Sequence, residues 1–291
     1  MKPRHLLATF TLWAAFTARA QVPQFVIVHN PEVDLSELKV DKDGFYVLFD
    51  GSSTFGWRGY AKDYLPPKWE LKDGTLHLKG PGGGEGGNIL FAHQFSDFIF
   101  EIEWKISEAG NSGIFYLGKE VATIITDEPK TEEFASPDGK VTIQQTVDNR
   151  GKLYYWPMYT CCPECQVLDN ERHPDAKAGA KPGIRQSSSV YDMIPAKPQN
   201  AKPAGEWNKV RIVFHKGKVT HYQNDVKVLS YDIWGKEWLE LLKKSKFGPE
   251  KWPLAFAMQQ KIGGDGRKGY FGLQDHGDEV WYRNIRVKEL K

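Results

Sequence analysis

Phe98-Ile-Phe-Glu-Ile-Glu-Trp-Lys-Ile106 is the stretch that decides the fold class. Every second residue from Phe98 to Ile106 is large and apolar, and the residues between them include Glu101, Glu103 and Lys105. Successive side chains of a strand point to opposite faces, so this alternation places one face in a core and the other in water. The stretch is therefore predicted to be a long strand with one buried face.

Strand and turn signals continue on both sides of this stretch. Residues 69–78 read as two short strands around Asp73-Gly74, and residues 219–229 as a hairpin with Asn224-Asp225 at its tip. Only residues 236–246 show helical spacing of apolar side chains. With no alternation of strands and helices, the chain is predicted to be all-β, an antiparallel β-sandwich or jelly roll with one short helix near 236–246.

The N-terminus reads as a signal peptide. Lys2 and Arg4 precede an apolar run, and Ala18-Arg19-Ala20 fits a cleavage site. We expect cleavage near Ala20 and export to the periplasm or medium, then a lead-in over 21–43 and a single domain over 44–291. Cleavage changes the formal charge from +2 to −1, which argues against a nucleic-acid partner. No later run is long enough for a transmembrane segment.

Three further segments have no predicted function in the sequence. Residues 80–87 are rich in glycine but lack the ending of a phosphate-binding loop, so they are expected to form a flexible surface loop. Cys161, Cys162 and Cys165 are expected to be structural, although a disulfide remains open in an exported protein. Residues 119–160 are expected to be an insertion beside the site, with no assigned role.

The polar stretch Pro163-Glu-Cys-Gln-Val-Leu-Asp-Asn-Glu-Arg-His-Pro-Asp175 is the candidate site. Strand alternation gives Glu164 and Gln166 the same face, with Asp169 at the strand's end and His173 in the following turn. Such a group of side chains can do acid/base chemistry. A solvated strand end with a polar turn is the competing interpretation.

Several short motifs, in this order, resemble one known family. They are 44–51 (GFYVLFDG), Gly56-Trp57, Trp69 with Asp73-Gly74, Asp97-Phe98, Asn111-Ser112-Gly113, 164–169 (ECQVLD), Tyr191-Asp192, 203–208 (PAGEWN), 272–277 (GLQDHG) and Arg283-Asn284-Ile285. The chain resembles the 3-keto-disaccharide hydrolase domain family, also described as 3-keto-glucoside lyase and hydratase, over about 44–290. The resemblance implies a concanavalin A-like lectin/glucanase sandwich in an exported bacterial protein. Two departures, Cys165 in place of a common aromatic residue and a longer region 119–162, leave the substrate open.

The implied substrates are glycosides with a ketone at C3 of the sugar. The ketone acidifies the hydrogen on C2, so a base can remove it while an acid helps the C1 group to leave, and water then adds to the enone. Glu164 and Asp169 are the candidates for base and acid, and His276 is a candidate proton shuttle. Net hydrolysis by direct displacement remains open. The residues indicate no definite cofactor, and a divalent cation held by the two carboxylates also remains open.

The remaining candidates are expected to bind the carbohydrate. They are Asn111, Gln166, His173, Tyr191, Gln274 and Arg283. Arg283 is included because strand parity places it with Trp281, Ile285 and Val287, although a structural ion pair is an equally serious account. Lys181 and Arg185 lie on the loop expected to close over the site, and Trp57, Trp69, Trp104 and Trp207 are expected in the core.

Two other functions compete with this one. A conventional glycosidase of the same fold would flank the bond with two carboxylates. A non-catalytic carbohydrate-binding module would need no acid/base pair, because this sandwich is equally a lectin fold. The oligomeric state, anomer and aglycone are not indicated by the sequence.

Overall fold

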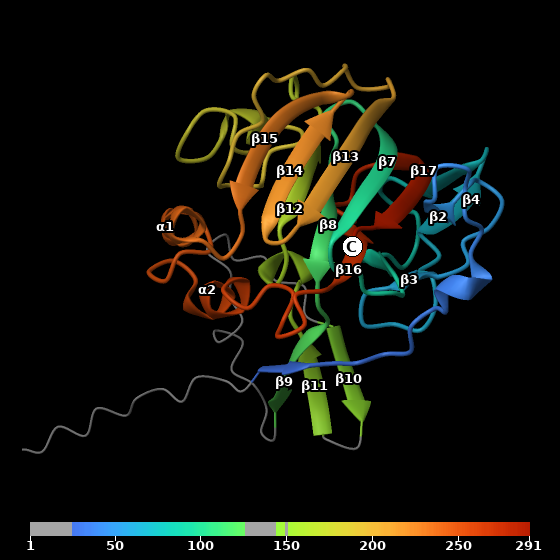
Figure 1. Ribbon diagram of the computed structural model, residues 1–291, viewed down its shortest axis with the longest axis horizontal. Helices are drawn as coiled ribbons and strands as arrows, with labels where there is room; N and C mark the ends of the chain where they lie inside the picture. Colours follow the sequence, from blue (N-terminus) through green and yellow to red (C-terminus); the bar gives the residue numbers. More distant parts are fainter. Residues whose placement is uncertain (1–24, 126–143, 149–150) are drawn as a thin grey trace, which may run out of the picture.

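The computed structural model describes residues 25–125, 144–148 and 151–291, so the predicted signal peptide lies outside the described residues. These residues form three antiparallel sheets, two of which are layered as a sandwich (Figure 1). The predicted all-β class and antiparallel sandwich are confirmed. Among the described residues, no helix has the length and apolar character that crossing a membrane requires.

The larger sheet has eight strands. In spatial order they are β15 (Val226–Asp232), β14 (Lys218–Gln223), β13 (Asn208–His215), β7 (Phe98–Ile106), β17 (Val280–Glu289), β5 (Thr75–Leu78) and β4 (Trp69–Lys72), with β2 (Tyr46–Phe49) beside β17. The predicted strand is β7, at the centre of this sheet. Both predicted hairpins are present, since Asp73-Gly74 and Asn224-Asp225 form two-residue loops with positive φ at each residue.

The second sheet has five strands and carries the site. Its order is β12 (Glu164–Leu168), β8 (Asn111–Gly118), β16 (Tyr270–Leu273), β6 (Ile89–Phe91) and β3 (Trp57–Gly59). Side chains of alternate positions on β8, β12 and β16 face the larger sheet. Those that face the other way are available for a site on the outer surface of the sandwich.

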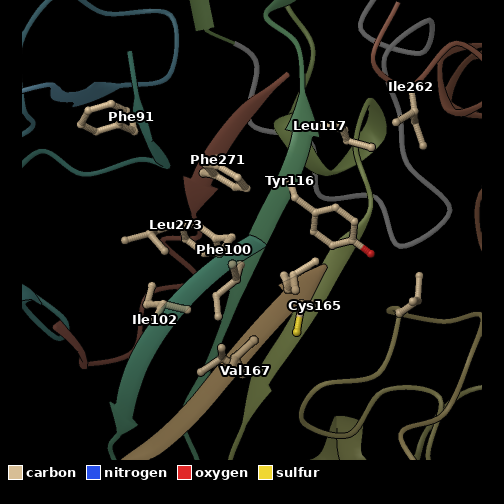
Figure 2. Close-up of a cluster of buried hydrophobic side chains, with 14 of the residues drawn as sticks. Phe91, Phe100, Ile102, Tyr116, Leu117, Cys165, Val167, Ile262, Phe271 and Leu273 are labelled. Carbon is tan, nitrogen blue, oxygen red and sulfur yellow. The ribbon is translucent and has the colours of Figure 1, made fainter. Parts of the chain in front are cut away.

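The core lies between these two sheets. Figure 2 shows Phe100 and Ile102 of β7 in one cluster with Phe271 of β16 and with Cys165 and Val167 of β12. The Phe100 and Phe271 rings stack across the two layers, with 4.0 Å between their centroids. Truncating such a fully buried ring typically costs about 3–5 kcal/mol. The alternating residues of β7 therefore join the sheets as predicted.

Two helices lie beside the β15 edge (Figure 1). The predicted helix is α1 (Lys236–Lys244), which buries Trp238 and Leu242. The second, α2 (Pro253–Gln259), was not predicted, because its sequence Pro-Leu-Ala-Phe-Ala-Met-Gln is short and has no polar face to give helical periodicity. Short 3-10 helices are at Leu35–Glu37, Met158–Thr160 and Pro174–Lys177.

A third sheet of four strands extends from one end of the sandwich (Figure 1). Its order is β1 (Phe25–Ile27), β9 (Val121–Ile125), β11 (Gly151–Tyr155) and β10 (Gln144–Asp148). The region 119–160, which had no assigned role, thus contributes three of the four strands of this sheet, β9, β10 and β11. The expected lead-in contributes β1 to it, paired in register with β9.

An irregularity in β17 overturns the predicted orientation of Arg283. The register of β17 against β7 shifts between Arg283 and Arg286, and Asn284 has a φ of 51°. This bulge reverses strand parity, so Ile285 and Val287 enter the core while Arg283 stays on the outer face. The parity argument assumed an uninterrupted strand and was wrong from this position on.

Candidate active site

A cavity of about 380 Å³ opens on the outer face of the five-stranded sheet. Its polar lining comprises Asn88, Asn111, Glu164, Gln166, Gln274, Asp275, His276 and Lys246. Its remaining lining is Gly87 and the largely aromatic set Tyr60, Tyr155, Trp156, Pro157, Met158, Tyr159 and Tyr191. A polar surface beside aromatic rings suits a sugar, which has hydroxyl edges and an apolar ring face.

Glu164 is the buried carboxyl of this cavity. It is the first residue of β12 and pairs with Phe115 of β8, whose ring packs on the outer face of the sheet. The neighbouring Gly113 leaves the space that the carboxylate occupies, since a Cβ there would lie 2.2 Å from Glu164 Oε1. Among the described residues, no side chain forms a hydrogen bond with this carboxylate. Local packing therefore directs Glu164 into the cavity.

Burial raises the pKa of the Glu164 carboxyl from 4.5 to about 8. The positive charge of Lys246 opposes this rise, and the negative charge of Asp175 adds to it. At neutral pH the carboxyl therefore holds a proton in most molecules. A protonated carboxyl inside a ligand cavity is suited to general acid catalysis.

A line of polar side chains runs from β12 to the mouth of the cavity. Gln166 Nε2 donates to Asn111 Oδ1 at 3.3 Å, and Asn111 Nδ2 lies 3.5 Å from His276 Nε2. On the other side of the ring, His276 Nδ1 lies 4.0 Å from Asp278 Oδ2. The sequence placed Gln166, Asn111 and His276 at the site, and the structure brings all three together.

His276 is kept neutral by its surroundings. Its side chain is 48% exposed at the mouth of the cavity. Even so, loss of hydration lowers the pKa of its imidazole below the usual 6.5, and Asp278 opposes this only in part. A neutral imidazole near neutral pH can accept a proton.

Gln274 and Asp275 follow β16 and differ in their partners. The Oε1 atom of Gln274 is buried and has no hydrogen-bond partner among the described residues, so it is available to a ligand hydroxyl. Asp275 is already held, since its carboxylate accepts from Lys68 Nζ, Gly87 N and Gly277 N, each at 2.9 Å. Gly86 permits this arrangement, because a Cβ there would lie 2.1 Å from Asp275 Oδ2.

Tyr191 reaches the cavity from the loop that follows β12. Its hydroxyl donates to Asp175 Oδ2 at 2.9 Å, and Arg185 binds the other oxygen of Asp175 at 2.7 Å. Burial and the charge of Asp175 raise the pKa of Tyr191 well above its usual value. Arg185 is therefore a structural cation of the loop, paired with both Asp175 and Asp192.

Two predicted residues, Asp169 and His173, lie outside the cavity. Asp169 caps a turn, because its carboxylate accepts from the backbone N–H groups of Ala109, Glu171 and Arg172. Burial alone would raise the pKa of Asp169, but these donors lower it below its usual value. His173 caps a 3-10 helix beside the mouth, with its ring centroid 6.3 Å from that of His276. Neither lines the cavity.

Arg283 lies on the outer face of the larger sheet, away from the cavity. Its Nε donates to Glu103 Oε2 at 2.8 Å, and its guanidinium lies 3.9 Å from the ring centroid of Trp207. Trp207 is partly exposed here, which corrects its expected place in the core; Trp57, Trp69 and Trp104 are buried as expected. The structural ion pair is the correct interpretation of Arg283.

Sequence reasoning missed much of the lining. Asn88 lies at the end of the glycine-rich loop, whose expected role was only a surface loop, and Lys246 at the end of the predicted helix. Tyr60 follows β3, where the buried ion pair of Arg58 with Glu120 fixes the chain. Tyr155 and Tyr159 belong to the region that had no role. Asp275 stands within the quoted motif at 272–277, which was the available signal.

The cysteines are structural. All three thiols are free and buried, so the disulfide left open by the sequence is absent. Burial raises the pKa of the Cys161 thiol to about 12, and also raises the pKa of Cys162 and Cys165. Within the described part of the chain, no group of three or more His, Cys, Asp and Glu side chains is arranged to hold a metal ion.

Comparisons with known proteins identify the family of this chain. The family model for the 3-keto-alpha-glucoside-1,2-lyase-like domain matches residues 44–288. A protein of Bacteroides thetaiotaomicron named 3-keto-disaccharide hydrolase is 50% identical over 264 residues, which cover 89% of this chain and 83% of that protein. A solved structure from Parabacteroides distasonis, described as a glycosyl hydrolase, has a TM-score of 0.60 at 21% identity and covers 86% of this chain and 95% of its own, which shows the shared fold. The chain therefore belongs to the 3-keto-alpha-glucoside-1,2-lyase-like domain family.

Proposed function

We propose that this protein is an enzyme that cleaves the glycosidic bond of 3-keto-glycosides, including 3-keto-disaccharides, with net hydrolysis. Family membership and the name of the relative that is 50% identical support the substrate class. The observation that carries the proposal is Glu164, a buried carboxyl with a raised pKa, facing a polar cavity that also contains His276.

The chemistry of a 3-keto sugar explains why the reaction uses one acid and one base. The carbonyl at C3 acidifies the hydrogen on C2, because the electrons left behind delocalise onto the carbonyl oxygen. Collapse of this enolate expels the group at C1, which takes a proton from an acid. Addition of water to the resulting enone then gives the free 3-keto sugar.

The opposite pKa shifts of the two groups assign their roles. Near pH 7 Glu164 is mostly protonated, since its pKa is about 8, and His276 is mostly neutral, since its pKa is lowered. Environments that move two titratable groups in opposite directions indicate which is the acid and which the base. We assign Glu164 as the acid for the leaving group and His276 as the base for the C2 proton. Asp169, the acid expected from the sequence, has no part in this scheme.

The remaining polar groups are suited to holding the sugar. Gln166 and Asn111 are linked to each other and retain unused donors and acceptors. The buried Oε1 of Gln274 can accept from a hydroxyl of the substrate. Tyr155 and Tyr60 provide aromatic surface next to these amides. A ring held between amides and aromatic side chains would be fixed in orientation, which is a large part of catalysis.

A conventional glycosidase fits this cavity less well. Such an enzyme needs a second carboxylate free to attack or to activate water. The other carboxylate of the lining, Asp275, accepts one ammonium and two backbone N–H donors. Its negative charge is therefore neutralised by Lys68 and its lone pairs are largely used.

We also propose that the enzyme is exported. The basic start, apolar run and Ala18-Arg19-Ala20 site of the sequence support cleavage near Ala20 and a periplasmic or secreted enzyme. Comparing the N-terminal residue of the protein purified from its natural host with Gln21 would test this.

The test of function compares a disaccharide with its 3-keto form. Purified protein is incubated with each, and released sugar is followed by mass spectrometry, with Glu164→Gln as the matched inactive control. Cleavage of the keto form alone, abolished in the variant, is expected. Cleavage of the plain disaccharide would replace the proposal with a conventional glycosidase, and binding without cleavage would replace it with a carbohydrate-binding module.

A further inference from the structure

The elimination proposed above needs a third group, one that stabilises the negative charge on the C3 oxygen. The inference that follows rests on that proposed function. Among the described residues that line the cavity, Lys246 is the only lysine or arginine. Lys68 lies outside this lining and forms an ion pair with Asp275, at 2.9 Å.

The backbone holds Lys246 at the cavity. Lys246 lies just beyond the C-terminal end of α1, and its backbone N–H donates to Asp192 Oδ2 at 2.6 Å. The other oxygen of Asp192 accepts from Arg185 Nε at 2.7 Å. The loop that carries Tyr191 is thereby linked by hydrogen bonds to the residue that carries the ammonium.

Aromatic rings surround the ammonium. Lys246 Nζ lies 4.8 Å from the ring centroid of Tyr191, 5.0 Å from that of Tyr159 and 5.3 Å from that of Phe247. Rings at such distances attract a cation and cover part of its surface. A positive charge with less water around it acts more strongly on a charge that develops nearby.

The charge of Lys246 already acts on both proposed catalytic groups. It lowers the pKa of Glu164, against the larger effect of burial, and contributes to the lowered pKa of His276. One cation that influences both groups therefore lines the same cavity as they do.

We propose that Lys246 is a catalytic residue whose ammonium stabilises the enolate oxygen at C3 during removal of the C2 proton. The ammonium keeps all its protons, and one of its N–H groups donates to the oxygen. No covalent bond forms between enzyme and substrate. The same ammonium would bind the neutral carbonyl only weakly, so its effect is greatest when the oxygen becomes negative.

The experiment compares three variants with the natural protein, on a 3-keto-disaccharide. Lys246→Met removes the charge and keeps the length of the side chain, Lys246→Arg keeps the charge, and Lys244→Met removes an exposed charge at the end of the same helix. The measurements are kcat, exchange of the C2 hydrogen with solvent deuterium, and melting temperature. Each protein is also incubated with substrate and cyanoborohydride and its intact mass is measured.

We expect Lys246→Met to lower both kcat and C2 exchange by about 10²–10³-fold, as loss of an oxyanion donor does elsewhere. Lys246→Arg should stay within about tenfold of the natural protein, and Lys244→Met should match it. In Lys246→Met the alkaline limit of activity should also move upward, because the charge that lowers the pKa of Glu164 is gone. A role in folding alone would instead lower the melting temperature and leave kcat and C2 exchange of the folded protein unchanged.

Three results would overturn the proposal. Unchanged kcat and exchange in Lys246→Met would show that the ammonium is not used. Loss of activity in Lys246→Arg together with a reduced sugar adduct on the natural protein would show that Lys246 forms an imine with the ketone. Absence of cleavage by the natural protein would instead remove the proposed function, and this inference with it.

Discussion

The carboxyl group of Glu164 fills the space where a side chain at Gly113 would lie. A Cβ on Gly113 would be 2.2 Å from Oε1 and 2.8 Å from Cδ of Glu164. Gly113 lies on β8 opposite Gln166 of β12, so the carboxyl rests diagonally across two strands. The glycine is required here for space rather than for an unusual backbone conformation.

Replacement of Gly113 by alanine should therefore impair catalysis more than folding. The new methyl group displaces the Glu164 side chain, and misplacing a reacting group by about 1 Å can cost about 10²-fold in rate. We expect kcat on a 3-keto-disaccharide to fall by about 10–100-fold while the protein stays folded. The control is Gly80→Ala, whose Cβ would meet Glu279 Cβ at an ordinary 3.7 Å. Equal activity of the two variants would contradict the role of the carboxyl.

Glu164→Gln should stabilise the protein at alkaline pH. The pKa of Glu164 is about 8 in the folded protein, against 4.5 without burial. Below about pH 4.5 both states hold the proton, and between 4.5 and 8 the unfolded state alone releases it, so the natural protein loses stability as pH rises. Glutamine has no proton to release, so the advantage of Glu164→Gln should be absent near pH 4, grow through this interval and level off above pH 8.

Melting temperatures measured between pH 4 and 9 would check this. The matched control is Glu206→Gln, which removes an exposed carboxylate and should show no such interval. A stability difference independent of pH would mean that Glu164 is ionised throughout in the folded protein.

The rate of cleavage should have a bell-shaped dependence on pH. The alkaline limit, near pH 8, corresponds to loss of the Glu164 proton, and the acidic limit, below pH 6.5, to protonation of His276. Profiles of kcat/KM for the natural protein and His276→Gln would test the assignment. The variant should lose about 10²–10⁴-fold in rate and also lose the acidic limit, and a limit that survives would belong to another group.

Asp169→Ala should affect stability and leave the chemistry alone. Its carboxylate accepts three backbone N–H groups, and their loss should lower the free energy of unfolding by about 1–3 kcal/mol. Below its melting temperature the variant should keep kcat within about threefold, measured with the 3-keto substrate. A loss as large as that of Glu164→Gln would restore Asp169 as the second catalytic group.

The fold could be predicted from the sequence because its signals are local. The alternation of Phe98–Ile106 and the turn at Asp73-Gly74 depend only on neighbouring residues, and both were found as predicted. The orientation of Arg283 was not predictable in the same way. It depends on a bulge at Asn284 that interrupts the alternation, and the letters of the sequence do not mark this bulge.

Less than half of the cavity lining was predictable from the sequence. Glu164, Gln166 and Asn111 come from paired strands, where alternation gives the face of each side chain. Lys246 and Tyr60 come from segments far away in the chain and reach the cavity only through tertiary packing. Asp169 shows the converse, because its proximity in sequence to Glu164 does not bring it into the cavity.

The pairing of β1 with β9 extends the functional unit beyond the family match, which begins at residue 44. Phe25 of β1 lies 5.9 Å from Trp156, centroid to centroid, and Trp156 lines the cavity and donates to Thr123 of β9 at 2.8 Å. A shortened protein that starts at residue 44 would keep every proposed catalytic residue, yet lose the strand that braces this aromatic side of the cavity. We therefore expect the smallest active protein to be longer than the family match and to include Phe25–Ile27.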